Sequence, residues 1–121
     1  MNFRESLEQT LNAVPGALAL SLVGYDGIGI ESVAQRGEER VDMDNLSAEL
    51  TTFIRGISTA HADLKLGRLQ QVALLSPEYA SILSSVTAEY FLLCVMERKG
   101  FFGKARYELK KLAWRLEGEL Q

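Results

Sequence analysis

The sequence contains few of the residues that build disulfides, metal sites and acid–base catalysts. Its 121 residues include one cysteine, one histidine and two prolines. A single cysteine, Cys94, cannot form an internal disulfide, and it cannot build a metal site alone. We therefore expect no disulfide framework, no metal site and no cofactor.

Long hydrophobic runs and an excess of basic charge are also missing. No stretch approaches the ~20 apolar residues of a membrane span, and the first residues, MNFRESLEQ, carry charges where a signal peptide would need an apolar run. Thirteen Lys and Arg against sixteen Asp and Glu give a net charge of −3, which does not favour a general nucleic-acid binder. We expect a cytoplasmic protein with no membrane insertion and no nucleic-acid partner.

What the sequence does contain is a long helical pattern from Val41 to Leu66. One apolar stripe recurs in steps of three, four and seven: Leu46, Leu50, Phe53, Ile57 and Leu64. A second stripe holds small residues: Ala48, Thr52, Gly56, Thr59 and Ala60. Between Asn45 and Ala62 only Glu49 and Arg55 are charged. We interpret this helix as covered on one side by its own sheet and approached on the other by another chain.

The patterns around this helix predict two terminal helices and five strands. Residues 2–14 form an amphipathic helix that ends at Pro15-Gly16. Residues 17–25 alternate as a strand, with Leu18, Leu20 and Leu22 on one side. Asp26-Gly27 favours a type I′ hairpin into a strand over 28–35. Asp42 or Asp44 offers an N-cap for the long helix, and Gly67 a C-terminal cap.

Strands over 69–75, 79–87 and 90–96 and a helix from Phe102 to Leu120 complete the chain. The length suits one domain over residues 1–121. The order α-β-β-α-β-β-β-α predicts an α+β fold with a five-stranded antiparallel sheet. We expect the middle helix on one face and the two terminal helices on the other.

The order of elements, the hairpin from Leu22 to Ile30 (LVGYDGIGI), the long middle helix and the three closing strands resemble the roadblock/dynein light chain domain. That domain is a relative of the profilin-like and longin folds, and the resemblance covers nearly the whole chain. It implies a homodimer or heterodimer in which the middle helix and the following strand meet their counterparts. Many such domains bind or regulate Ras-like small GTPases, and a bacterial subfamily pairs with a polarity GTPase as its activating protein. Others are scaffolds in motor or signalling complexes, and the domain is not known as an enzyme.

The resemblance also implies where partners would bind. On the middle helix the expected dimer interface comprises the small-residue stripe: Ala48, Thr52, Gly56, Thr59 and Ala60. On the third strand it comprises Leu69, Gln71, Ala73 and Leu75 or their alternate neighbours. Gly56 carries particular weight, because glycine inside a helix costs about 1 kcal/mol relative to alanine. Close approach of a neighbouring helix would offset that cost. The polar face expected to contact a small GTPase comprises Ser47, Thr51, Arg55 and Ser58.

The residues that could carry chemistry have simpler interpretations. His61 has no motif beside it that supplies a nucleophile or a carboxylate, so we interpret it as a packing or interface histidine. Cys94 lies in the most apolar strand and is interpreted as a small core residue. Glu38, Glu39, Asp42 and Asp44 flank the start of the middle helix, where a solvated loop with a helix cap is the simplest explanation.

Two aromatic residues of the last helix, Tyr107 and Trp114, leave two alternatives open. They could anchor a partner, or they could pack against the first helix on the same sheet face, which we favour. For the whole chain the hypotheses are a dimeric regulator of a small GTPase, a structural adaptor dimer without effect on nucleotide turnover, and a small-molecule sensor. The sensor has least support, because no cluster of polar groups converges.

Overall fold

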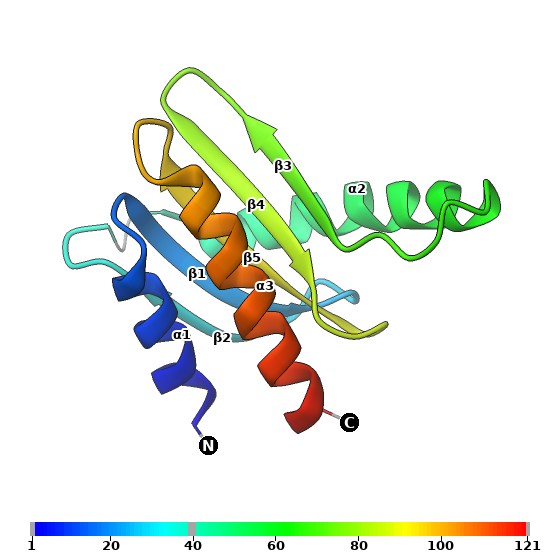
Figure 1. The fold of residues 1–121 in the computed structure, drawn as a ribbon, viewed down its shortest axis with the longest axis horizontal. Helices are drawn as coiled ribbons and strands as arrows, with labels where there is room; N and C mark the ends of the chain where they lie inside the picture. The colour runs from blue at the N-terminus through cyan, green and yellow to red at the C-terminus, as the bar shows by residue number, and fades with distance from the viewer. Residues whose placement is uncertain (1, 39–40, 121) are drawn as a thin grey trace.

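The computed structural model describes residues 2–38 and 41–120. Figure 1 shows the elements in chain order: α1 (Phe3–Ala13), β1 (Ala17–Gly24), β2 (Gly29–Ala34), α2 (Met43–Asp63), β3 (Gln71–Leu75), β4 (Tyr79–Ser85), β5 (Tyr90–Glu97) and α3 (Phe102–Glu119). The predicted order is confirmed, and most boundaries shift by one or two residues. Among the described helices, none combines the length and the apolar character needed to cross a membrane.

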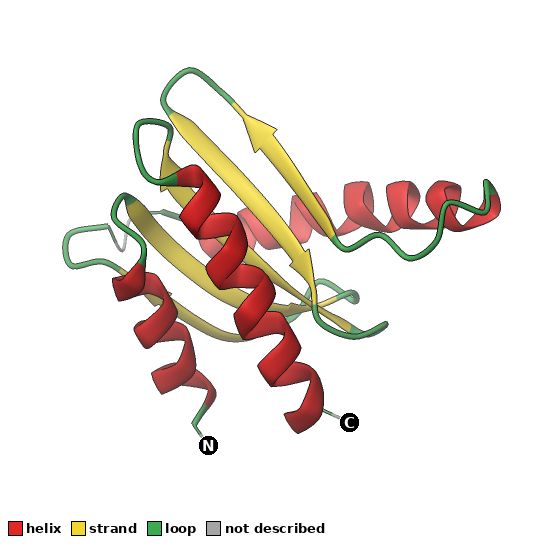
Figure 2. Ribbon diagram, in the orientation of Figure 1, coloured by secondary structure: helices red, strands yellow, loops and turns green. Residues whose placement is uncertain are grey.

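The five strands form one antiparallel sheet in the order β2-β1-β5-β4-β3. The two hairpin units join where β1 pairs with β5, so the strands that α2 connects, β2 and β3, are the two edges. Figure 2 shows α1 and α3 on one face of the sheet and α2 on the other. One core cluster lies between the sheet and the pair α1 and α3, and a second lies beneath α2. The predicted fold class and the placement of the helices on the two faces are therefore confirmed.

The central strands are buried on both faces, as their composition predicts. All eight residues of β1 are buried, and so are residues 91–96 of β5. In β5, Phe91, Leu93 and Val95 join the core under α2, whereas the residues between them join the core under α1 and α3. A strand covered on both sides needs apolar residues at every position, which explains the uninterrupted run.

One side chain of β1 lies on the opposite face from its prediction. Ala17 pairs with Met96 and Ala19 with Val95, so Leu18 is an extra residue between two paired positions. Such a β-bulge turns the strand and re-aims a side chain. Leu18 consequently packs in the core under α2, while Leu20 and Leu22 pack under α1 and α3. The prediction that Leu18 shares a face with Leu20 and Leu22 is wrong for this reason.

The β1–β2 hairpin forms where predicted, but with a longer loop. The Gly27 amide donates to the Gly24 carbonyl at 2.9 Å, and the Gly24 amide donates to the Ile28 carbonyl at 2.9 Å. Gly27 has a φ of 90°, whereas Asp26 is not among the described residues with positive φ. A type I′ turn would require positive φ at both. Three residues therefore lie between the hydrogen-bonded pair Gly24 and Ile28. The Asp26 side chain accepts a hydrogen bond from the Ile28 amide at 3.0 Å.

The long helix does not face the sheet with its apolar stripe. Its buried residues are Met43, Ser47, Thr51 and Ile54. The Thr51 hydroxyl donates to the Ser47 carbonyl at 2.6 Å, which satisfies a polar group that burial would otherwise penalise. Small side chains at these positions let the helix lie close to the sheet, with Leu46 and Leu50 partly buried at its flank. The predicted orientation is therefore only partly correct.

The two ends of α2 are stabilised by different means. At its start, the Asp42 carboxylate accepts a hydrogen bond from the Asn45 amide at 3.0 Å, which confirms one of the two predicted N-caps. At its end, the Lys65 amide donates to the Ala62 carbonyl and the Leu66 amide to the His61 carbonyl. This is the Schellman arrangement, with Lys65 at a φ of 60°. Gly67, the predicted cap, lies two residues beyond the positive-φ position at Lys65 and therefore does not cap the helix.

Candidate functional site

The outer side of α2 carries apolar side chains that the described part of the chain leaves exposed. Figure 1 shows that the C-terminal part of the helix extends past the sheet. Phe53 is 45% exposed and Leu64 is 70% exposed, although both belong to the predicted apolar stripe. Beside the helix, β3 has a hydrogen-bonded neighbour on one side only among the described strands. An apolar helix flank next to an open strand edge is a surface that a second chain can cover.

The residues expected at a dimer interface do not all lie on this surface. Those on α2 are all exposed: Ala48, Thr52, Gly56, Thr59 and Ala60. No atom of another element lies within 4 Å of a β-carbon placed on Gly56. Leu69 packs against the core under α2, as Val72 and Leu74 do.

The expected β3 residues point to the other face of the sheet. Because successive strand residues alternate, Gln71, Ala73 and Leu75 lie on the α3 side when Val72 and Leu74 lie under α2. Gln71 confirms this placement through two hydrogen bonds to Arg106 of α3. The Gln71 Nε2 donates to the Arg106 carbonyl at 3.1 Å, and the Arg106 Nε donates to the Gln71 Oε1 at 3.0 Å. These three residues are therefore not on the same face as the small stripe of α2.

The expected GTPase-binding face divides into two parts. Ser47 and Thr51 are buried against the sheet, so the prediction that they form an accessible partner surface is wrong. The sequence was misleading because small polar residues commonly mark a solvent face, whereas here the hydroxyl of Thr51 is satisfied inside the helix. Arg55 is exposed and Ser58 is partly buried.

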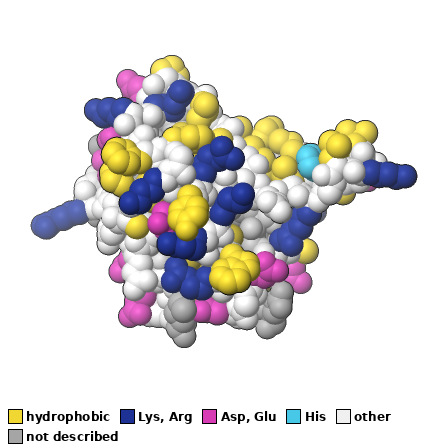
Figure 3. Space-filling model, viewed as in Figure 1, with side chains coloured by type: hydrophobic (Ala, Val, Ile, Leu, Met, Phe, Trp, Pro, Cys, Tyr) yellow, Lys and Arg dark blue, Asp and Glu magenta, His cyan; other side chains and the backbone are white. Residues whose placement is uncertain are grey.

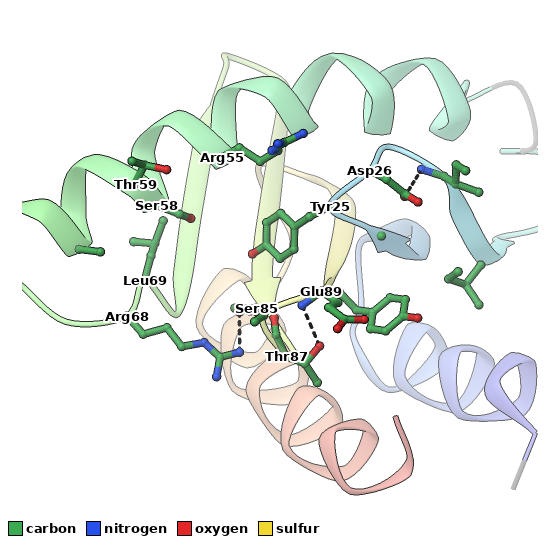
Figure 4. Close-up of a pocket in the computed structure, with 16 residues that line it drawn as sticks. Tyr25, Asp26, Arg55, Ser58, Thr59, Arg68, Leu69, Ser85, Thr87 and Glu89 are labelled. Carbon is green, nitrogen blue, oxygen red and sulfur yellow. Dashed lines mark hydrogen bonds between the residues drawn. The ribbon is translucent and has the colours of Figure 1, made fainter. Parts of the chain in front are cut away.

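Arg55 and Ser58 line a groove that sequence reasoning did not find. The groove has a volume of about 830 Å³ and lies between α2, the β1–β2 hairpin and the β4–β5 turn (Figure 4). Arg55 and Arg68 contribute positive charge, and Asp26 and Glu89 contribute negative charge. These residues are far apart in the sequence and meet only because the ends of three elements converge. No local spacing could have signalled the groove.

Several groups in the groove are held in place by contacts with neighbouring residues. The Arg68 guanidinium donates to the Ser85 Oγ at 3.0 Å, and the Glu89 amide donates to the Thr87 Oγ1 at 3.0 Å. The ring of Tyr25 lies with its centroid 5.0 Å from that of Phe91 in the core. Figure 4 shows Tyr25 standing between α2 and the turn that carries Glu89. The walls of the groove therefore carry both signs of charge, and neighbouring residues hold several of its side chains.

The residues considered for chemistry occupy structural positions. The His61 Nδ1 lies 3.0 Å from the Gly67 carbonyl, which can only accept, so the ring donates there. Burial raises the pKa of the Cys94 thiol to about 12, and a thiol that stays protonated is a poor nucleophile. Asp42 caps α2, whereas Glu39 lies outside the described residues. No group of three or more His, Cys, Asp or Glu among the described residues could hold a metal ion.

The two aromatic residues of α3 are not packed against α1. Tyr107 is 63% exposed and Trp114 is 79% exposed. The helix instead turns Leu109, Leu112 and Leu116 toward the core that it shares with α1. The favoured packing interpretation is therefore wrong, because the leucines already fill the space between the helices and the sheet.

A five-stranded antiparallel sheet with one long helix on one face and two terminal helices on the other defines the class of roadblock-like and profilin-like α+β domains. No protein-family model matches the sequence, and no curated protein matches it. Solved structures do. MglC from Myxococcus xanthus is 31% identical over 98% of this chain and 99% of its own, with a TM-score of 0.70.

Two other solved structures share the fold at lower identity. A Roadblock/LC7 domain from Streptomyces avermitilis has a TM-score of 0.86 at 15% identity, over 99% of this chain and 98% of its own. The gliding protein MglB from Thermus thermophilus has a TM-score of 0.78 at 20% identity, over 94% of this chain and 84% of its own. The chain belongs to the roadblock domain family.

Proposed function

We propose that this protein is a non-enzymatic dimeric regulator that binds a Ras-like small GTPase and activates GTP hydrolysis by it. The observation that carries the proposal is the uncovered outer side of α2, with Phe53 exposed and Gly56 facing open space in a member of the roadblock family. Such a helix has an apolar flank that one chain does not bury. The proposal places the protein in the cytoplasm.

The dimer is proposed to form through α2 and the open edge of β3. Val72 and Leu74 belong to the same core cluster as the flank of α2, so a second chain at this edge would extend both the sheet and the core. Gly56 and Ala60 lie beside this flank and allow close approach of a helix. Ala48, Thr52 and Thr59 lie further round the exposed side of α2 and would contribute at its margin.

The GTPase is proposed to contact Arg55, Ser58 and the groove beneath them. Arg55 is exposed and charged, and the groove offers both signs of charge within one surface. A regulator of this kind grips the mobile switch segments of the GTPase and favours one of their conformations. The residues of the GTPase itself then complete catalysis.

The test mixes the purified protein with Ras-like GTPases from the same organism and follows single-turnover GTP hydrolysis. One of them should be accelerated by at least about tenfold, a lowering of the barrier by about 1.4 kcal/mol. Arg55→Ala should reduce this acceleration, whereas Arg36→Ala, an exposed arginine in the loop after β2, should not. Failure of every such GTPase to bind would contradict the proposal.

The alternative is a structural adaptor dimer in a larger assembly without effect on nucleotide turnover. The exposure of Trp114 on α3 favours it, because that surface lies on the opposite face of the sheet from α2. A GTPase that binds while its hydrolysis rate stays unchanged would support the adaptor and contradict the activator.

A further inference from the structure

The basic residues of this protein are concentrated in one segment. Seven of the thirteen Lys and Arg residues, but only one of the sixteen Asp and Glu residues, lie between Arg98 and Arg115. The rest of the chain therefore carries six basic residues against fifteen acidic ones. The segment comprises the turn after β5 and most of α3. A protein with a negative net charge thus presents a strongly positive surface at one place.

Exposed aromatic side chains lie among these basic residues. Lys104, Tyr107, Lys111 and Trp114 follow one another at steps of three and four, so they form one line along the outer side of α3. The Lys111 ammonium lies 5.5 Å from the centroid of the Tyr107 ring and 3.1 Å from the Glu108 carboxylate. Figure 3 shows Lys and Arg side chains interspersed with hydrophobic ones over this helix.

A groove of about 240 Å³ opens beside Trp114. Lys110, Trp114 and the acidic Glu117 of α3 form one wall, and Arg68 and Gln70 from the segment before β3 contribute to the other, so the groove has two basic residues and one acidic residue. The Arg68 guanidinium is held by its hydrogen bond to the Ser85 Oγ, so a positive charge is fixed at this groove. An apolar side chain could enter beside Trp114 while a carboxylate next to it paired with Lys110 or Arg68.

We propose that the outer side of α3, with the groove beside Trp114, is a docking surface for an acidic segment of a partner protein that carries an apolar or aromatic side chain. Charge complementarity selects the acidic segment, and the exposed tryptophan supplies the kind of anchor that dominates protein interfaces. The surface lies across the sheet from α2. Because Arg68 lines both this groove and the groove proposed for the GTPase, the two sites adjoin at that residue, but the inference does not rest on the proposed function.

The shape and charge of the surface favour a protein segment over an extended polyanion. A bilayer is flat and would leave the groove beside Trp114 unfilled. A nucleic acid or an anionic bilayer is also larger than the basic surface, and its further charges would meet the acidic remainder of the chain. A short peptide extends little beyond the basic surface, and screening limits interactions between exposed charges to about 8 Å at physiological salt.

The experiment selects peptides from a phage-displayed library of random dodecapeptides on the purified wild-type protein. The enriched peptides should be rich in Asp and Glu and contain an apolar or aromatic residue. The tightest one is then synthesised without tryptophan and titrated into the protein. Trp114 is the single tryptophan of the chain, so its emission should shift to shorter wavelength as the peptide covers it.

Three variants locate the contact. Trp114→Ala and Lys110→Glu, followed through a fluorophore on the peptide, should each weaken binding by about tenfold or more. Arg36→Glu is the matched charge reversal in a distant exposed loop, and it should leave binding within about twofold. Sedimentation should show the same oligomeric state for all variants, because the surface is proposed to bind a partner and not a second copy.

Several results would overturn the proposal. Enriched peptides that are not acidic, or the absence of any enrichment, would contradict the charge argument. Unchanged Trp114 emission, or equal binding by Lys110→Glu, would place the contact elsewhere. Tighter binding of phosphatidylglycerol vesicles or of a single-stranded oligonucleotide than of the peptide would assign the surface to that ligand. Dissociation of the protein's own oligomer by Trp114→Ala would assign it to a contact between copies.

Discussion

Gly16 and Gly100 bring two turns of the fold into direct backbone contact. The α-carbon of Gly100 lies 2.7 Å from the position that a β-carbon on Gly16 would take. The contact joins the turn between α1 and β1 to the turn between β5 and α3. Two backbone hydrogen bonds accompany it, from the Glu97 amide to the Gly16 carbonyl at 2.9 Å and from the Phe101 amide to the Pro15 carbonyl at 3.2 Å. The pair thus sets where both terminal helices leave the sheet.

Gly16→Ala should therefore destabilise the fold through two separate effects. Gly16 has a φ of 91°, which costs a residue with a β-carbon about 1–2 kcal/mol, and the clash with Gly100 adds to that cost. We expect a loss of about 3 kcal/mol or more in the free energy of unfolding, measured by urea denaturation. Gly37→Ala is the matched control, because Gly37 has a φ of 87° and, beyond its chain neighbours, no described residue has an atom within 4 Å of a β-carbon placed there. Equal losses for the two variants would contradict the role of the close contact.

Lys65 offers a position where substitution should stabilise the protein. It holds a φ of 60° at the end of α2, a conformation that glycine adopts without the penalty of a β-carbon. Lys65→Gly should raise the free energy of unfolding by about 1 kcal/mol. Lys65→Ala removes the same side chain but keeps the β-carbon, and should bring no such gain. If both variants gain the same free energy of unfolding, the cause is the loss of the lysine charge and not the relief of the positive φ.

Gly56 tests where two chains meet. Gly56→Leu should fold, because nothing lies within 4 Å of the added β-carbon and leucine favours a helix by nearly 1 kcal/mol over glycine. If a second helix approaches there, the variant should sediment as a monomer at concentrations where the wild type is dimeric. Gly103→Leu places the same side chain in open space on α3 and should leave the oligomer intact. If Gly56→Leu remains a dimer, Gly56 does not lie in the interface between the two chains.

Cys94 should make the free energy of unfolding decrease as the pH becomes alkaline. Burial raises the pKa of its thiol to about 12, whereas an unfolded thiol has a pKa of about 8.5. The folded state thus keeps a proton that the unfolded chain releases. The stabilising contribution is complete below about pH 8.5 and decreases as pH rises toward the folded pKa, by up to about 1.4 kcal/mol per pH unit.

The check compares urea denaturation of the wild type and Cys94→Ala between neutral pH and pH 10. All other side chains are the same in both proteins, so the difference in the free energy of unfolding between the wild type and Cys94→Ala reports on the thiol alone. That difference should shrink as pH rises. Parallel stability curves would show that the thiol titrates alike in both states.

The sequence by itself determined the order of the elements and the class of the fold. Uninterrupted apolar residues in β5 required a strand covered on both sides, and Asp26-Gly27 required a reversal of the chain between two strands. These are local properties, because hydrophobic periodicity and turn chemistry act over a few residues. They sufficed to place α2 on one face of the sheet and α1 and α3 on the other.

Only the tertiary structure decided which side of each element faces what. One inserted residue turned Leu18 to the other face of the sheet. Ser47 and Thr51 became buried because close packing of α2 favours small side chains whose hydrogen bonds are satisfied within the helix. Trp114 stayed exposed because leucines filled the core beneath α3. Each outcome depends on contacts between residues far apart in the chain, which residue spacing along one segment does not encode.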